Sequence, residues 1–180
     1  MKKTLLALIM MVSVLTLNAQ LLKYEGFDYP VNDTLPQHGW VGINGGDSIV
    51  VVNGSLDYAG LVPSAGNKIA FGSYGRDYQY LITSQATGTV YMSYILNVTD
   101  ITSLDATGGY FTGLGATSTN FCSTTWTKKG TTGYFIGLNA RTTAAYTTWD
   151  TQEFAPGTTV FVVVSYEMIS GATNDIAKMW

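Results

Sequence analysis

The stretch Thr89-Val-Tyr-Met-Ser-Tyr-Ile-Leu-Asn97 decides the fold class. Alternate side chains of an extended chain point to opposite faces of a sheet. One set of alternating positions here is Val, Met, Tyr and Leu, and the other is Tyr, Ser, Ile and Asn. Both faces therefore carry apolar side chains, which is typical of a central strand of a β-sandwich.

A second strong strand signal covers Thr158–Ile169, where β-branched and aromatic residues follow one another. Val and Thr lose χ1 freedom in a helix, so this run favours a strand. The Gly, Asn and Asp residues of the next segment, 170–175, are typical turn formers. The sequence therefore predicts a hairpin that returns over Ile176–Trp180. Because the chain stops inside this predicted strand, we expect a domain that is incomplete at its C-terminal end.

Shorter strand signals fill the rest of the chain, separated by clusters of Gly, Asn, Asp and Ser. They cover residues 22–24, 48–52, 55–58, 68–71, 79–82, 110–114, 133–138 and 144–149. No helical periodicity and no break in composition appear after residue 19. The sequence predicts an all-β fold, an antiparallel β-sandwich forming one domain over residues 20–180.

The composition agrees with this fold class. Charged residues make up 12% of the 180 residues and aromatic residues 13%, and there are 20 Gly but 4 Pro. Helix surfaces are normally rich in Glu, Lys, Arg and Ala, whereas Glu occurs here only as Glu25, Glu153 and Glu167. These features exclude a helical bundle, a coiled coil and a charged disordered tail.

The first 19 residues have the pattern of a targeting signal rather than of part of the folded domain. Lys2 and Lys3 precede the apolar run Thr4–Leu17, and Ala19-Gln20 offers a cleavage point, as in a secretory signal peptide. The apolar run is shorter than the roughly 20 residues that a membrane-spanning helix needs. The sequence predicts a signal-peptide helix over residues 1–19, a secreted or cell-surface product and no transmembrane segment in the mature chain.

The charge balance excludes one class of partner. Loss of Lys2 and Lys3 takes the formal net charge from −3 to −5, and the only arginines are Arg76 and Arg141. Binding to a phosphate backbone needs clustered Lys and Arg side chains. We therefore expect no nucleic-acid partner.

Several motifs in order resemble one family of exported domains. They are the opening YEGFDYP of residues 24–30, the segment VNGSLDYAGL of residues 52–61, the strand GTVYMSYI of residues 88–95, the repeated GYFxGL of residues 109–114 and 133–138, and the final NDIAKMW of residues 174–180. Together they resemble the concanavalin A-like, or laminin-G-like, jelly-roll domains of large bacterial surface proteins. The leader ending in Asn-Ala-Gln is similar to those of Bacteroidota, which implies a parent protein secreted through the type IX system.

The residues needed for catalysis are missing from the expected positions. Jelly-roll glucanases place carboxylates on one strand as Glu-x-Asp-x-x-Glu, and a retaining glycosidase needs two carboxyl groups about 5–5.5 Å apart. Glu25, Glu153 and Glu167 are too far apart in sequence to form that pattern. The lone histidine, His38, lies in a segment without a nucleophile motif and excludes multi-histidine metal sites. We expect a protein without enzymatic activity, in which the lone Cys122 is buried or available for intermolecular pairing.

Two kinds of ligand remain as candidates. Calcium takes carboxylate and carbonyl oxygens, and laminin-G-like domains often hold one such ion in loops, for which the loop candidates are Asn44, Asp47, Asp100 and Asp105. A sugar ring can stack on an exposed aromatic side chain flanked by polar groups. The candidates for that role are Trp126, Tyr146, Trp149 and Asp150. Trp126 and Trp149 lie in Thr-rich, loop-like surroundings, and packing in the core or in a loop is their alternative role.

These observations favour a non-catalytic extracellular binding or adhesion module, with glycans or a cell-surface or matrix protein as the partner. One alternative is a structural spacer domain within a large surface protein. The other is a glycan-degrading enzyme whose catalytic residues lie outside these 180 residues. An exposed aromatic ring beside polar groups would favour the binding module over the spacer.

Overall fold

The computed structural model describes residues 19–72, 75–171 and 173–180. The predicted signal-peptide helix lies outside the described residues, apart from Ala19. Helical structure in the described part consists of two short 3-10 turns, η1 (Leu35–His38) and η2 (Ala144–Tyr146). No helix in the same part of the chain has the length and apolar character needed to cross a membrane.

One layer of the fold is a four-stranded antiparallel sheet. Its strands are β6 (Gly109–Gly115), β7 (Phe121–Lys129), β8 (Tyr134–Asn139) and β9 (Thr148–Trp149), and each pairs with the next along the chain. β6, β8 and β9 overlap with strands that the sequence predicts.

The second layer is a three-stranded antiparallel sheet of β5 (Gly88–Asn97), β10 (Thr159–Met168) and β11 (Ile176–Met179). The hairpin of β10 and β11 confirms the prediction for the end of the chain. The sequence also suggested a central position for the strand at residues 89–97, and this is wrong. β10 lies between β11 and β5, whereas β5 pairs with β10 alone among the described residues.

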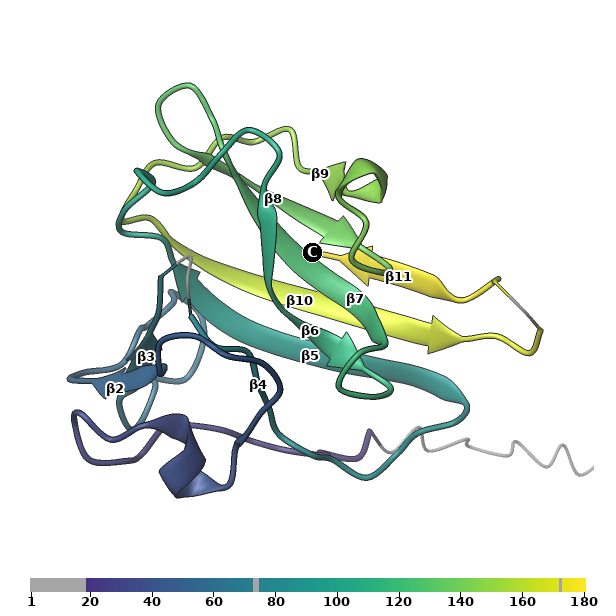
Figure 1. Cartoon of the computed structure of the whole chain (residues 1–180), viewed down its shortest axis with the longest axis horizontal. Coiled ribbons are helices and arrows are strands. Elements are labelled where there is room, and N and C mark those ends of the chain that lie inside the picture. Colours follow the sequence, from purple (N-terminus) through teal and green to yellow (C-terminus); the bar gives the residue numbers. More distant parts are fainter. Residues whose placement is uncertain (1–18, 73–74, 172) are drawn as a thin grey trace, which may run out of the picture.

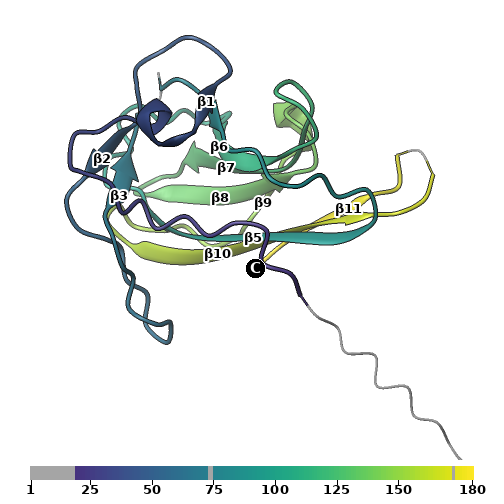
Figure 2. The ribbon, with the colours of Figure 1, turned by 90° about the horizontal axis from the view of Figure 1, so that it is seen from below.

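The two sheets stack face to face, as Figures 1 and 2 show. Tyr134 and Ile136 of β8 meet Val162 and Val164 of β10 in a buried cluster in which no side chain is more than 2% exposed. The apolar residues that pack around this cluster include Met92, Tyr94, Leu96, Leu138 and Met179. Burial of an aliphatic or aromatic side chain contributes about 1.5–3 kcal/mol, so this cluster holds the layers together.

Two small pairs of strands form the N-terminal part. β1 (Val41–Gly42) pairs with β4 (Tyr78–Gln79), and β2 (Val50–Val52) pairs with β3 (Lys68–Ala70). The predicted strands over residues 22–24 and 55–58 are not strands in the structure.

Sequence reasoning missed two of the described strands, the short β1 and the long β7. The sequence of β7, Phe-Cys-Ser-Thr-Thr-Trp-Thr-Lys-Lys, is polar and suggested a loop around Trp126, and that interpretation is wrong. Two buried hydroxyl groups of this strand bond to nearby carbonyl groups. Ser123 Oγ donates to the C=O of Ser165 at 3.1 Å, and Thr124 Oγ1 donates to the C=O of Asn139 at 3.0 Å. Because these hydroxyl groups have partners, a polar strand can occupy the middle of a sheet.

The predicted class is therefore confirmed: the protein is an all-β antiparallel sandwich. The jelly-roll arrangement that the family resemblance implies stays a prediction.

Candidate functional site

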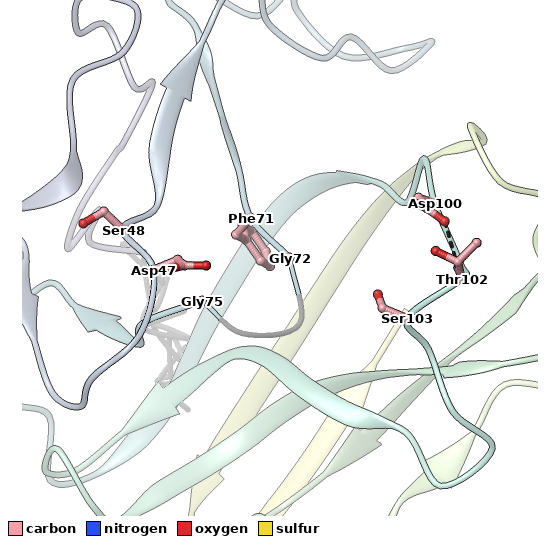
Figure 3. Close-up of a pocket in the computed structure, with 8 residues that line it drawn as sticks. All are labelled: Asp47, Ser48, Phe71, Gly72, Gly75, Asp100, Thr102 and Ser103. Carbon is pink, nitrogen blue, oxygen red and sulfur yellow. Dashed lines mark hydrogen bonds between the residues drawn. The ribbon is translucent and has the colours of Figure 1, made fainter.

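Three chain segments meet around an open pocket of about 280 Å³, drawn in Figure 3. They are the β1–β2 loop, the β3–β4 loop and the β5–β6 loop. The lining combines one aromatic ring with carboxylates, hydroxyl groups and two glycines, and consists of Asp47, Ser48, Phe71, Gly72, Gly75, Asp100, Thr102 and Ser103. We call this the Phe71 pocket.

Phe71 provides the aromatic surface of the pocket. The residue directly follows β3, and 47% of it is exposed. Figure 3 shows it beside Asp47, with Asp100 on the loop across the pocket. An accessible ring of this kind can stack against the apolar face of a sugar.

Backbone contacts hold Asp47 in place. Its C=O accepts the N–H of Arg76 at 2.8 Å, and residue 47 forms an isolated parallel bridge with Gly75. These contacts use the main chain, and the carboxylate projects toward the side of the pocket where Phe71 lies (Figure 3).

Asp100 opens a tight turn on the other side of the pocket. Its Oδ1 accepts the backbone N–H of Thr102 at 2.8 Å. Hydrogen bonds from the backbone and side chain of Thr102, together with the positive charge of Lys129, hold the pKa of Asp100 below its usual value. Asp100 is therefore ionised at neutral pH and can accept hydrogen bonds from the hydroxyl groups of a ligand.

Two of the four predicted calcium ligands, Asp47 and Asp100, line the Phe71 pocket. Asn44 instead forms two hydrogen bonds with Asp77, one as donor and one as acceptor. Its Nδ2 donates to Asp77 Oδ2 at 2.8 Å, and the N–H of Asp77 donates to Asn44 Oδ1 at 2.6 Å. The fourth candidate, Asp105, accepts a backbone N–H through Oδ1 at 2.7 Å in the turn before β6.

The four candidates therefore do not fit one shared calcium site. Within residues 19–72, 75–171 and 173–180, no three His, Cys, Asp or Glu side chains gather in a way that could hold a metal ion. A calcium ion at the Phe71 pocket would need Asp47, Asp100 and further carbonyl or hydroxyl oxygens. Calcium dependence remains a prediction for these two carboxylates.

The predicted sugar-stacking tryptophans lie on the outer face of the four-stranded sheet. Tyr110, Trp126, Gly137 and Trp149 form one row across the sheet, because each is paired directly with the next. Trp126 is 3% exposed, and the Tyr110 ring meets it edge-on with 5.9 Å between centroids. Trp126 therefore offers no open ring face to a sugar and packs as part of the sheet, the alternative role that the sequence had left open.

Trp149 is half-buried on the same face. A Cβ built on Gly137 would lie 2.6 Å from Cε3 of Trp149, so the ring lies directly against the backbone of β8. Lys128 Nζ lies 4.5 Å from the centre of the Trp149 ring and 5.3 Å from that of Phe135. The ammonium group interacts with both rings and would compete with a sugar for the Trp149 ring.

The other two predicted sugar-binding residues are Tyr146 and Asp150. Tyr146, in η2, is 76% exposed. Asp150 directly follows Trp149, donates its N–H to the C=O of Ile136 at 2.8 Å and lines a second pocket next to the core. Since neighbouring residues of an extended chain face opposite ways, Trp149 and Asp150 are not on one surface. The structure does not bring the four candidates together.

Two of the three glutamates considered for catalysis, Glu153 and Glu167, make structural contacts. Glu153 Oε1 accepts the N–H groups of Thr132 and Gly133, both at 2.6 Å, in the β7–β8 turn. Glu167 pairs with Lys178 across β10 and β11 at 3.8 Å. The two glutamates therefore lie in different parts of the fold.

His38 and Cys122 also lie outside the Phe71 pocket. His38 stacks on Tyr29 with 3.7 Å between ring centroids, and its Nε2 lies 2.9 Å from Asp33 Oδ2. Cys122 is half-buried at the start of β7, where burial raises the pKa of its thiol. The thiol is therefore protonated at neutral pH, which is the less reactive form.

Sequence reasoning found two carboxylates of the Phe71 pocket and missed its ring and hydroxyl groups. Phe71 counted as the end of a predicted strand, and Ser48 as the beginning of another. The available signal was the number of polar residues in the two loops that carry Asp47 and Asp100. Nothing in those loops indicated that they meet.

Comparison of the chain with protein-family models, with curated proteins and with solved structures finds no match.

Proposed function

We propose that this protein is a non-catalytic binding module for glycans and that the Phe71 pocket is its sugar site. The observation that carries this proposal is an accessible phenyl ring in a pocket whose other side chains are carboxylates and hydroxyl groups. A ring provides stacking, and ionised carboxylates accept hydrogen bonds from sugar hydroxyl groups. The volume of about 280 Å³ suits one or two sugar units rather than a long chain.

The proposal includes an extracellular location. The pattern of residues 1–19 supports export through a signal peptide, and the resemblance of residues 22–180 to laminin-G-like domains of Bacteroidota surface proteins supports a role in adhesion. A glycan on a cell surface or in a matrix is then the ligand class that such a module meets.

A glycan array followed by NMR titration of the full chain tests the proposal. We expect saturable binding to a limited set of glycans, with shifted amide signals in the loops that carry Asp47, Phe71 and Asp100. Phe71→Ala should weaken binding about tenfold or more, because it removes the stacking surface. Tyr146→Ala is the matched control: it removes another exposed aromatic ring and should leave affinity unchanged.

Variants of the two carboxylates and a chelator test whether the carboxylates bind the sugar and whether calcium takes part. Asp47→Asn and Asp100→Asn should each weaken binding, and addition of a chelator decides whether calcium takes part. A folded chain that binds no glycan would favour the spacer role instead. Hydrolysis of a bound glycan that is lost in Asp47→Asn would contradict the non-catalytic part of the proposal.

A further inference from the structure

Two Asn-Gly dipeptides occur in the chain, Asn44-Gly45 and Asn53-Gly54. Asparagine is one of the chemically labile residues, and its side-chain amide is lost most readily when glycine follows. The backbone nitrogen of the next residue is the nucleophile, and glycine has no Cβ to hinder the attack or to restrict the conformation that the attack needs. The two dipeptides differ in which atoms are held, so the structure distinguishes their reactivity.

At Asn53-Gly54, in the β2–β3 connection, the attacking backbone is held. The Gly54 N–H donates to Asn67 Oδ1 at 2.9 Å. Lys68 Nζ donates to the C=O groups of Asn53 and Gly54 at 2.7 and 2.9 Å. These hydrogen bonds fix the backbone on both sides of the peptide bond that would be attacked. An N–H group that donates to an acceptor loses its proton less readily, so we expect this dipeptide to react slowly.

At Asn44-Gly45, in the β1–β2 loop, the backbone is open and only the side chain is held. Both residues are exposed, and a Cβ built on Gly45 would meet no atom within 4 Å. Among the described residues, the Gly45 N–H donates to no acceptor. The Asn44 amide is held by its two hydrogen bonds with Asp77, which are exposed at the surface. Contacts of this kind open far more often than a core does, so Asn44 is the more reactive asparagine.

Asp77 connects this dipeptide to the four-stranded sheet. Its Oδ2 accepts the Asn44 amide and also the hydroxyl group of Tyr110 on β6, at 3.2 Å. Its C=O accepts the N–H of Ile43 at 3.0 Å, next to the β1–β4 pair. An aspartate at position 44 would have no amide N–H to donate and would bring a second carboxylate beside Asp77. The two carboxylates would repel each other, so the conversion would loosen this end of the β1–β4 pair.

We propose that Asn44 is a site of spontaneous deamidation whose rate is set by its contact with Asp77. The Gly45 nitrogen forms a bond to Cγ of Asn44, the bond from Cγ to Nδ2 breaks, and ammonia leaves with the proton of the Gly45 N–H. Water then opens the cyclic succinimide at either of its carbonyl groups, which leaves aspartate or isoaspartate at position 44. The product carries one additional negative charge and a loosened β1–β2 loop, so this surface changes as the molecule ages.

Incubation of the full 180-residue chain at mildly alkaline pH, followed by peptide mapping with mass spectrometry, tests the proposal. We expect aspartate and isoaspartate to accumulate at position 44 at least about threefold faster than at position 53. Asp77→Ala removes the acceptor of the Asn44 amide and should speed conversion at position 44 about two- to tenfold, without a change at position 53. Asp77→Asn keeps an acceptor oxygen at this place and is the matched control, with a rate close to that of the unsubstituted chain.

A variant of the nucleophile covers the case in which Asp77→Ala unfolds, which would speed conversion at both positions. The φ angle of Gly45 lies outside the left-handed region, and its Cβ position is open. Gly45→Ala should therefore fold normally and should slow conversion at position 44 at least about tenfold, because its methyl group hinders the attack. An unchanged rate in this variant would overturn the proposal, as would an intact Asn44 in the unsubstituted chain.

The structural consequence has its own pair of variants. Asn44→Asp should lower the melting temperature, measured by circular dichroism, because it places a carboxylate beside Asp77. Asn53→Asp makes the same change at an exposed position near Lys68 and should not lower it. Equal melting temperatures of the two variants would overturn the loosening of the β1–β4 pair. Conversion at position 53 as fast as at position 44, or a rate at position 44 that a folded Asp77→Ala variant leaves unchanged, would overturn the role of Asp77.

Discussion

Glu153 shows how a single carboxylate can organise a turn. Its Oε1 accepts two backbone N–H groups in the β7–β8 connection, which hold the pKa of Glu153 below its usual value. A carboxyl group whose pKa is lower in the folded state stabilises that state above its unfolded pKa of about 4.3. This contribution is lost as pH falls through the folded pKa.

We therefore expect Glu153→Gln to lower the melting temperature at pH 7 and to have a smaller effect near pH 3. Thermal unfolding followed by circular dichroism across this range measures the difference. Glu167→Gln removes a carboxylate that pairs with Lys178 on the surface and serves as the control, with a small effect at pH 7. A Glu153→Gln deficit that is the same at both pH values would contradict this role.

For the Phe71 pocket, the sequence could predict individual residues but not their arrangement in space. Asp47 and Asp100 were predictable as loop carboxylates, because Asx residues between strand signals are visible in the sequence. That these carboxylates lie around one pocket with Phe71 was not predictable, since it depends on how β3 and the β5–β6 loop are placed in space. For Trp126 the sequence left a packing role and a sugar-binding role open, and it could not decide between them because the burial of Trp126 comes from neighbours on β6 and β8.

At the scale of elements, β5, β10 and β11 were predictable and β7 was not. The first three carry alternating or β-branched apolar residues, which is the main sequence signal of a strand. β7 carries Ser and Thr instead, and the hydroxyl groups of these residues also bond to the backbone in turns. Its side-chain hydrogen bonds to distant carbonyl groups make it a strand, and such partners are invisible in a one-dimensional pattern.

Thr124 of β7 tests this explanation. Its Oγ1 bonds to the C=O groups of Asn139 and Arg141 and accepts the indole N–H of Trp126 at 2.9 Å. Thr124→Val keeps the shape and removes these bonds, so we expect a loss of about 1–3 kcal/mol in the free energy of unfolding. Urea denaturation followed by tryptophan fluorescence measures it.

The neighbouring Thr125 provides a matched control. Its Oγ1 is buried without a hydrogen-bond partner among the described residues, so Thr125→Val should change the free energy of unfolding far less. If the two variants were equally destabilised, hydrogen bonding of Thr124 would not be the reason that β7 tolerates its polar sequence.

For the whole molecule, stability depends on the contact between the two sheets. Val164 is fully buried at this contact, whereas its neighbour Val163 lies on the outer face of the same strand and is half-buried. We expect Val164→Ala to lower the free energy of unfolding by about 2 kcal/mol or more, and Val163→Ala by about 1 kcal/mol or less. Chemical denaturation of the two variants compares these costs directly, and similar values would argue against the face-to-face packing of the sheets.

The pairing of β5 with β10 has a consequence for the order of events in folding. Every residue of β5 pairs with one at least 62 positions later in the chain, whereas β6, β7 and β8 each pair with the next strand along the chain. Closing a long loop carries an entropy cost before any contact rewards it, so distant pairings form slowly. During synthesis on the ribosome, the meander from β6 to β9 can assemble as soon as it emerges, while β5 must wait for β10. In that interval β5 lacks its neighbouring strand among the described residues, and this is the stage at which a chaperone would have most to protect.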